Sequence, residues 1–391
     1  MESRMWIWQS RAEAMVMATS RAAVVTGPGG PVEIREYPVP DPGPGEAVIR
    51  VELCGICGTD AHVFHGRLPT ITFPALLGHE IVGIVTALGA GLDTDFAGRP
   101  VAVGDRIGVF PATSCGTCHT CVVLRRPGQC PRRPPSYGFK SPVDSGPPLT
   151  GGFADYLHLV NPGTVFYRTE LPPEVAVLAE PMSVALHGIH RAGIGLGATV
   201  VVQGVGAIGL MVVAAARAAG AARVVAVDGS ARRLALATEL GADATVDITP
   251  LSPGAARHAA VREALGGSGA TAVLGCSGSP EGFIEAIGYV ADGGTLAELG
   301  NFTDRGAIAF NPYTDLLRRD LTITGVYGAG PDMHARYLRA LEILERGGPP
   351  FTRVVSHRVP LRDVEPALRS LSTGHQLYGT DVVKIAIDPA R

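Results

Sequence analysis

Several hallmarks of other protein classes are scarce or missing in this sequence of 391 residues. Charged residues make up only 18% and the net charge is -3, so composition provides no general attraction for nucleic acid or an anionic membrane. No apolar run reaches the roughly 18–20 residues of a membrane span. Residues 1–18 contain the only two tryptophans but lack the basic start, apolar middle and cleavage site of a signal peptide. These absences predict a cytoplasmic protein without nucleic-acid or membrane partners.

Apolar residues are plentiful, at 46% of the chain, and can bury a sizeable core. The 51 glycines and 31 prolines predict many tight turns rather than disorder, because apolar runs continue throughout the sequence. The length favours two or three domains. Residues 1–18 are expected to form an N-terminal extension, since the first strand-like run begins only at Ala22.

Four of the seven cysteines crowd into 16 residues: Cys115, Cys118, Cys121 and Cys130. Without an export signal, this spacing favours a metal site over disulfides. Four thiolates form a closed tetrahedral zinc site, which supports folding and has no open position for a substrate. The alternative, four free thiols in a loop, would invite oxidation. His119 lies within the run but is surplus to four thiolates, and we expect it to face solvent.

A second metal-ligating pattern lies earlier, in Cys54-Gly-Ile-Cys57-Gly-Thr59-Asp60-Ala-His62 and in Gly78-His79-Glu80. A catalytic zinc keeps three protein ligands, so that the fourth position stays open. Cys57 and His79 are the first two candidate ligands. The third is Glu80 next door or Glu180 far downstream, and the residue pattern leaves this choice open.

The first half of the chain reads as short strands separated by Gly/Pro turns. The runs 22–25, 32–34, 47–53, 81–88 and 105–109 predict a barrel-like or distorted sheet. Residues 173–193 have helical periodicity, with Pro172 and Pro173 at the helix entrance.

From residue 198 strands alternate with helices. Strands are predicted at 199–203, 223–228, 244–247, 272–274 and 295–299, and helices at 207–219, 231–240, 255–264 and 281–290. This alternation predicts an α/β fold with a doubly wound parallel sheet.

A dinucleotide-binding pattern sits at the first strand-to-helix junction, Gly204-Val-Gly206-Ala207-Ile208-Gly209. Gly204 makes the turn, Gly206 lets the backbone approach a pyrophosphate, and Gly209 lets helix and strand pack closely. Asp228 ends the next strand and suits the adenosine ribose hydroxyls, so NAD is favoured over NADP. Arg232 and Arg233 complicate this preference, because either could approach a 2′-phosphate or brace the ribose.

Six motifs in this order, GICGTDxH, GHE, CxxCxxC…C, GGFADY, AEP and GxGxxG, resemble the zinc-dependent medium-chain alcohol dehydrogenase family. The resemblance spans residues 22–389, and the GICGTD and AEP forms are similar to polyol, threonine and secondary-alcohol dehydrogenases. It implies a GroES-like, β-rich catalytic domain at 19–181 and 328–391 around a Rossmann NAD-binding domain at 182–327.

The resemblance also implies site residues. Cys57 and His79 match catalytic zinc ligands. Glu80 matches the acidic residue beside the histidine, which in relatives either ligates the zinc or swings in during ligand exchange. Glu180 matches the position of the third zinc ligand in relatives. Thr59 matches the hydroxyl that bonds the substrate oxygen. His62 matches the outer end of a proton relay, and Asp60 would hold His79. The cofactor-binding set comprises Gly204, Gly206, Ala207, Ile208, Gly209, Asp228 and Arg233.

Two departures from the family pattern stand out. Eight residues separate Cys121 from Cys130 where seven are usual, and Gly58 replaces an arginine that binds pyrophosphate in some relatives. Another cation is therefore needed there, or the cofactor is held more weakly.

The sequence thus predicts a zinc-dependent dehydrogenase that transfers hydride between a secondary or polyol-like alcohol and NAD. Two zinc ions per chain and a homodimer or homotetramer are expected. The alternatives are a non-enzymatic NAD-binding or redox-sensing protein with structural zinc only, and a zinc-independent quinone or enoyl reductase of the same fold.

Overall fold

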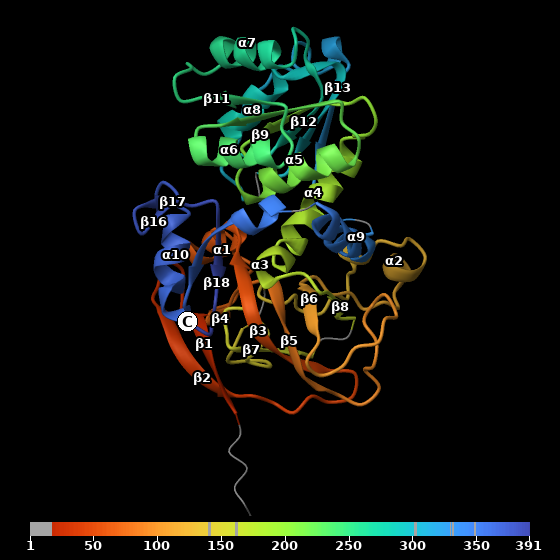
Figure 1. Ribbon diagram of the computed structural model, residues 1–391, viewed down its shortest axis with the longest axis vertical. Coiled ribbons are helices and arrows are strands. Elements are labelled where there is room, and N and C mark those ends of the chain that lie inside the picture. Colours follow the sequence, from red (N-terminus) through yellow and green to blue (C-terminus); the bar gives the residue numbers. More distant parts are fainter. Residues whose placement is uncertain are drawn as a thin grey trace, which may run out of the picture.

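Two bodies built on separate sheets are stacked along the long axis of the molecule (Figure 1). The computed structural model describes residues 18–139, 142–160, 163–300, 303–328, 330, 332–347 and 349–391. All but the last residue of the predicted N-terminal extension, 1–18, lies outside the described residues.

A seven-stranded sheet forms the lower body in Figure 1. Its strands follow the order β15-β18-β3-β5-β6-β8, with β7 pairing β3 on a branch. The sheet draws on both ends of the chain, because β15 and β18 come from the C-terminal segment. Its strands are β3 (Ala47–Ile56), β5 (Glu80–Leu88), β6 (Arg106–Phe110), β7 (Tyr156–Leu159), β8 (Val165–Arg168), β15 (Val355–Val359) and β18 (Lys384–Ile387).

A smaller antiparallel sheet, of order β2-β1-β4, closes the lower body. It consists of β1 (Thr19–Val25), β2 (Val32–Pro38) and β4 (Ala75–Leu76). The run from Ala22 to Val25 is fully buried in one apolar core with the inward side chains of β3, β5 and β18. These strands confirm the predicted β-rich domain. The lower body also contains a short hairpin, β16 (Gln376–Leu377) and β17 (Thr380–Asp381).

A six-stranded parallel sheet forms the upper body, with the order β11-β10-β9-β12-β13-β14. The strands are β9 (Thr199–Gln203), β10 (Arg223–Asp228), β11 (Ala244–Asp247), β12 (Ala270–Gly275), β13 (Val290–Glu298) and β14 (Thr322–Gly325). This is the strand order of a dinucleotide-binding fold, as predicted. Val200 and Val202 face one apolar cluster and Val201 faces the other, because side chains alternate along a strand that is buried on both faces.

Helices cover this sheet and connect it to the lower body (Figure 1). The described helices are α1 (Gly58–Phe64), α2 (His119–Val122), α3 (Pro173–Ala176), α4 (Ala179–Arg191), α5 (Ala207–Ala218), α6 (Ala231–Glu239), α7 (Ala255–Ala264), α8 (Pro280–Ile287), α9 (Met333–Arg346) and α10 (Val364–Ser370).

Two helix predictions differ from the structure. The helix predicted at 281–290 ends at Ile287, because Val290 already pairs with Ala270 of β12 as the start of β13. The helix predicted at 173–193 is split into α3 and α4. Pro181 has no N–H to donate to Val177, so a continuous helix cannot pass through this point.

One apolar cluster crosses from body to body. It joins Leu53 of β3 and Phe110 of β6 to buried residues of α4, α5 and α9. The two bodies therefore share a core, with α4 between them in Figure 1. The domain limits at 181/182 and 327/328 stay a prediction. Among the described residues, no helix has the length and apolar character needed to cross a membrane.

Candidate active site

Cys57, His79 and Glu80 come together at the edge where β3 ends and β5 begins. Gly55 is the register partner of Glu80, and Cys57 is the N-cap of α1 immediately after β3. The thiol sulfur, an imidazole nitrogen and a carboxylate oxygen all lie within 4.8 Å of one another. The pairing of two strands thus assembles residues more than 20 positions apart into one group.

Asp60 fixes the geometry of this group. Its Oδ2 accepts a hydrogen bond from the backbone N–H of Cys57 at 2.8 Å, and its Oδ1 lies 3.2 Å from His79 Nδ1. Although burial opposes the charged imidazolium, this carboxylate raises the pKa of His79 well above its ordinary value. With Nδ1 facing Asp60, Nε2 is the nitrogen left for a metal.

Glu80 has a buried counterion that sequence reasoning missed. The Lys384 ammonium on β18 forms an ion pair with Glu80 Oε2 and donates a hydrogen bond to the Ile56 carbonyl at 3.0 Å. Burial opposes its charge, but Glu80 raises the pKa of Lys384 above the usual value. The available signal was its rarity: Lys384 is one of two lysines in the chain and interrupts the apolar run of the last strand.

Glu180, in the first turn of α4, lines the same cavity but is not part of the close cluster. Burial raises its pKa to about 7, and the neighbouring Glu80 carboxylate acts in the same direction. The geometry therefore favours Glu80 as the carboxylate next to Cys57 and His79. Glu180 lines the same cavity outside this close group.

The chemistry of this group fits a zinc ion. Sulfur, imidazole nitrogen and carboxylate oxygen are the donors that catalytic zinc takes, with one position left open. Glu80 Oε1 is buried and has no hydrogen-bond partner among the described residues. Such an atom is costly unless a ligand satisfies it.

The four clustered cysteines meet in a separate lobe around α2. Their sulfurs all lie within 4.8 Å of one another, with separations of 3.5 Å for Cys118–Cys121 and 4.0 Å for Cys115–Cys121. Zinc–sulfur bonds of about 2.3 Å in a tetrahedron require sulfur separations of about 3.8 Å. This group therefore fits a closed zinc site, and His119 lies outside the four ligands.

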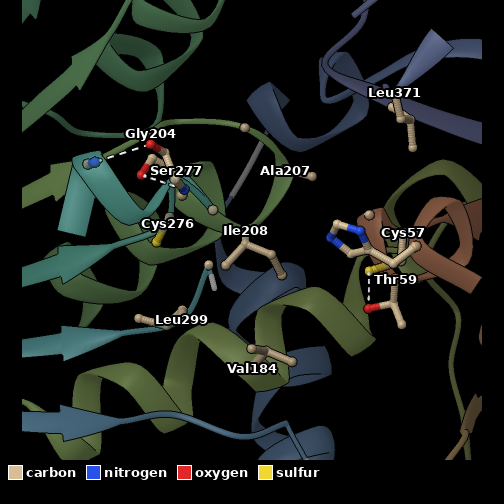
Figure 2. Close-up of a pocket in the computed structure, with 18 of the residues that line it drawn as sticks. Cys57, Thr59, Val184, Gly204, Ala207, Ile208, Cys276, Ser277, Leu299 and Leu371 are labelled. Carbon is tan, nitrogen blue, oxygen red and sulfur yellow. Dashed lines mark hydrogen bonds between the residues drawn. The ribbon is translucent and has the colours of Figure 1, made fainter. Parts of the chain in front are cut away.

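A cavity of about 1020 Å³ joins the Cys57 group to the glycine-rich turn. Figure 2 shows Cys57 and Thr59 on one side, Gly204 and Ser277 on the other, and Ile208 between them. Thr59 Oγ1 lies 3.6 Å from Cys57 Sγ. Apolar side chains also line the cavity, among them Phe110, Phe139, Val184 and Leu299, with Leu299 on the Gly204 side in Figure 2. Phe139 packs on His79 with ring centroids 4.5 Å apart, a contact that the sequence did not reveal.

His62 lines this cavity on α1 and has cationic neighbours. Arg67 Nη1 lies 3.4 Å from His62 Nδ1, and Arg305 reaches the same region from the upper body. Burial, followed by the charges of Arg67 and Arg305, lowers the pKa of His62. The lowered pKa favours the neutral imidazole, which is the form that can act as a base.

The predicted glycines form the other end of the cavity. Gly204 has a φ of +83°, and a Cβ there would lie 2.8 Å from the Ser277 backbone. A Cβ on Gly209 would collide with the Gly204 carbonyl, whereas Gly206 has nothing within 4 Å of its Cβ position. The turn therefore leaves open space at Gly206, before α5 begins at Ala207. A pyrophosphate fits this arrangement.

Asp228 and Arg233 line the cavity next to this turn. The Asp228 carboxylate accepts hydrogen bonds from the N–H groups of Val205 and Ser230, both at 2.8 Å. Arg233 donates to the Val382 carbonyl at 2.8 Å. Arg232 instead donates to Asp381 and is not among the residues lining the cavity.

Comparison with known proteins places these features in context. The profile "Alcohol dehydrogenase GroES-like domain" matches residues 43–166, and "Zinc-binding dehydrogenase" matches residues 207–346. A 5-exo-hydroxycamphor dehydrogenase of Pseudomonas putida is 34% identical over 92% of this chain and 97% of its own length. A sorbitol dehydrogenase of Ovis aries is 32% identical over 95% and 98%.

Solved structures agree with these matches. An alcohol dehydrogenase from Thermotoga maritima superposes with a TM-score of 0.86 at 27% identity, covering 95% of this chain and 99% of that one. A Sinorhizobium meliloti protein, assigned as a zinc-binding dehydrogenase and solved with NADP, has a TM-score of 0.79 at 30% identity over 95% and 100%.

The cysteine lobe yields a first prediction. Replacing Cys118 with Ser should remove one zinc per chain and lower the free energy of unfolding by about 3 kcal/mol or more, because the lobe loses its cross-link. Elemental analysis and chemical denaturation measure both effects. His119→Ala, in the same lobe, is the matched control and should keep its zinc. Equal zinc content in the two variants would contradict the site.

Proposed function

Because the chain belongs to the zinc-dependent medium-chain dehydrogenase family, we propose that it is an alcohol dehydrogenase for a secondary or polyol-like alcohol, with NAD as hydride acceptor. The main support is that the Cys57–His79–Glu80 group and the Gly204–Gly209 turn line one cavity. A substrate held at one end and a nicotinamide cofactor extending from the other would meet within it.

Each residue of the catalytic end has a proposed role. Cys57 and His79 hold the metal, and Asp60 orients the imidazole through Nδ1. When bound, zinc supplies Lewis acidity that makes a nearby hydroxyl easier to deprotonate. Thr59 Oγ1 accepts the hydroxyl proton in a hydrogen bond. His62, neutral and partly exposed, is the base that releases a proton to solvent.

Lys384 complements this set. Its buried ammonium neutralises the charge of Glu80. The Glu180 carboxylate can then approach the group with less electrostatic repulsion. Glu80 is then either a ligand or a carboxylate held beside the metal, and Glu180 is the alternative third ligand. The second zinc, at Cys115, Cys118, Cys121 and Cys130, would have a structural role only.

NAD is the proposed cofactor because Asp228 places a negative charge at the end of β10. A 2′-phosphate would be repelled there, whereas ribose hydroxyls can donate to the carboxylate. Arg233 is already bonded to Val382, which reduces its availability for a phosphate. A homodimer or homotetramer stays a prediction.

The central test combines metal content with turnover. Wild-type protein should hold two zinc ions and reduce NAD with secondary alcohols or polyols. Cys57→Ala should hold one zinc, and its kcat/KM should fall by about a thousandfold, because the hydroxyl loses its Lewis acid. Zinc analysis and NADH absorbance measure these two quantities.

Cys54→Ala, a buried thiol three residues earlier that lies outside the described metal groups, is the control and should retain both zinc ions. One zinc per wild-type chain with no alcohol-dependent NADH would instead identify a redox-sensing protein with structural zinc only. Undiminished turnover in Cys57→Ala with only the one remaining zinc would identify a reductase that needs no catalytic zinc.

Cofactor choice is tested at Asp228. Wild-type kcat/KM should favour NAD over NADP, and Asp228→Asn should reduce that ratio by about tenfold, or about 1.4 kcal/mol, because the repelling charge is gone. Steady-state kinetics with both cofactors provide the ratio. Asp247→Asn, at the exposed end of the adjacent strand β11, should leave it unchanged. A wild-type preference for NADP would refute this assignment.

The pH profile is tested at Arg67. A cation near His62 disfavours the imidazolium, so its removal in Arg67→Gln should raise the pKa of His62. Below that pKa the base is protonated, and the acidic limb of kcat/KM for alcohol oxidation should therefore move to higher pH. Arg339→Gln, on the exposed face of α9, is the control. A limb that stays in place or moves to lower pH would exclude His62 as the titrating base.

A further inference from the structure

Arg133 is a cation of the cavity wall that the proposed chemistry does not use. It is partly buried, and it lines the cavity together with Ser136 and Phe139. Among the described residues, no hydrogen bond or ion pair to its side chain is found. The adjacent Arg132 is exposed and donates to Thr117 Oγ1 at 3.2 Å. Of these two neighbouring arginines, only Arg133 lines the cavity, whereas Arg132 bonds to the cysteine lobe at the surface.

The backbone holds Arg133 at the catalytic end of the cavity. The carbonyl of Pro134 accepts from Thr113 Oγ1 at 3.0 Å, and the N–H of Tyr137 donates to the Pro111 carbonyl at 3.0 Å. The segment 133–139 therefore runs beside residues 111–113, which follow β6. It ends with Phe139 against His79. A side chain from this segment that enters the cavity faces the substrate, not the nucleotide turn.

The chain segment that carries this wall has charges of one sign only. Residues 106–143 contain five arginines and one lysine but no aspartate or glutamate, in a protein whose net charge is -3. No carboxylate from this segment can therefore neutralise Arg133. Around Arg133 this wall is mostly apolar, with Phe110, Pro111, Ala112 and Phe139 lining the cavity. A guanidinium on a mostly apolar wall binds an anion more strongly than one in open solvent.

The opposite sign prevails around the metal-ligating group. Glu80 and Glu180 both lie at that end of the cavity. An anionic group on the substrate would be repelled from these carboxylates and attracted to Arg133. The reacting hydroxyl and the anionic group must therefore be on different carbons, with the hydroxyl at the Cys57 group and the anion at the wall.

We propose that Arg133 recognises an anionic group of the substrate, so that the favoured alcohol is a hydroxy acid or a hydroxyalkyl phosphate rather than a neutral alcohol. This inference rests on the proposed dehydrogenase function and specifies its substrate class. Arg133 follows Cys130 by three residues, so the cysteine lobe also sets the position of this anion-binding side chain.

Matched substrate pairs test the inference. 3-Hydroxybutyrate is compared with its neutral amide, and glycerol 3-phosphate with glycerol, so that the two pairs distinguish a carboxylate from a phosphate. Wild-type kcat/KM should be at least about tenfold higher for the charged member of one pair, mainly through a lower KM. Arg133→Gln should abolish this ratio, and Arg133→Lys should restore part of it. Arg132→Gln, one residue away, should retain it.

Two readouts separate this inference from the proposed function. If neutral alcohols reduce NAD while neither charged member is favoured, the dehydrogenase stands and the role of Arg133 is wrong. If no alcohol is oxidised, the anion site is tested by calorimetry, which measures the binding of 3-hydroxybutyrate and glycerol 3-phosphate to the zinc-loaded protein. Weaker binding to Arg133→Gln than to Arg132→Gln supports the anion site. Equal binding overturns it, because the acids then sit on the metal alone.

Discussion

The position of the catalytic group depends on one buried carboxylate. Asp60 accepts from the backbone of Cys57, faces the imidazole of His79 and lies 3.4 Å from the N–H of Gly78. It thereby ties the first turn of α1 to the approach to β5. A sulfur and a nitrogen from two separate segments are held in a fixed relation before any ion arrives. This preorganisation lowers the reorganisation needed for binding a metal.

The spacing of the two bodies has a different origin. The upper body is a parallel sheet, and its glycine-rich turn lies at the carboxyl end of β9, where such sheets bind nucleotides. The lower body supplies the metal-ligating edge. An apolar core that continues through α4 and α9 joins the two bodies, so their spacing is set by packed side chains rather than by surface charges alone. The cavity between them is consequently a feature of the fold.

Local patterns in the sequence predicted the parallel sheet, because strand and helix periodicities are local properties. They also predicted the glycine turn and the two groups of metal-ligating residues. They did not reveal Lys384, Phe139 or Arg133, whose significance comes from contacts with distant segments. The start of β13 was missed for the same reason: Val290 continues a helical pattern locally, but pairing with Ala270 determines its conformation. The sequence likewise left the choice between Glu80 and Glu180 open, because it does not show that Glu80 lies with Cys57 and His79 in one close group.

The ion pair between Lys384 and Glu80 joins the last strand to an early one. Lys384 Nζ also bonds the carbonyl of Ile56, which lies 328 positions earlier in the chain. During synthesis on the ribosome, the parallel sheet, whose strands all fall between Thr199 and Gly325, can form while β18 is still untranslated. Until the final residues emerge, Glu80 lacks its cation and the end of β3, from Cys54 to Ile56, lacks the strand that pairs with it. The sheet edge that carries Cys57, His79 and Glu80 is therefore among the last parts of the protein to assemble during synthesis.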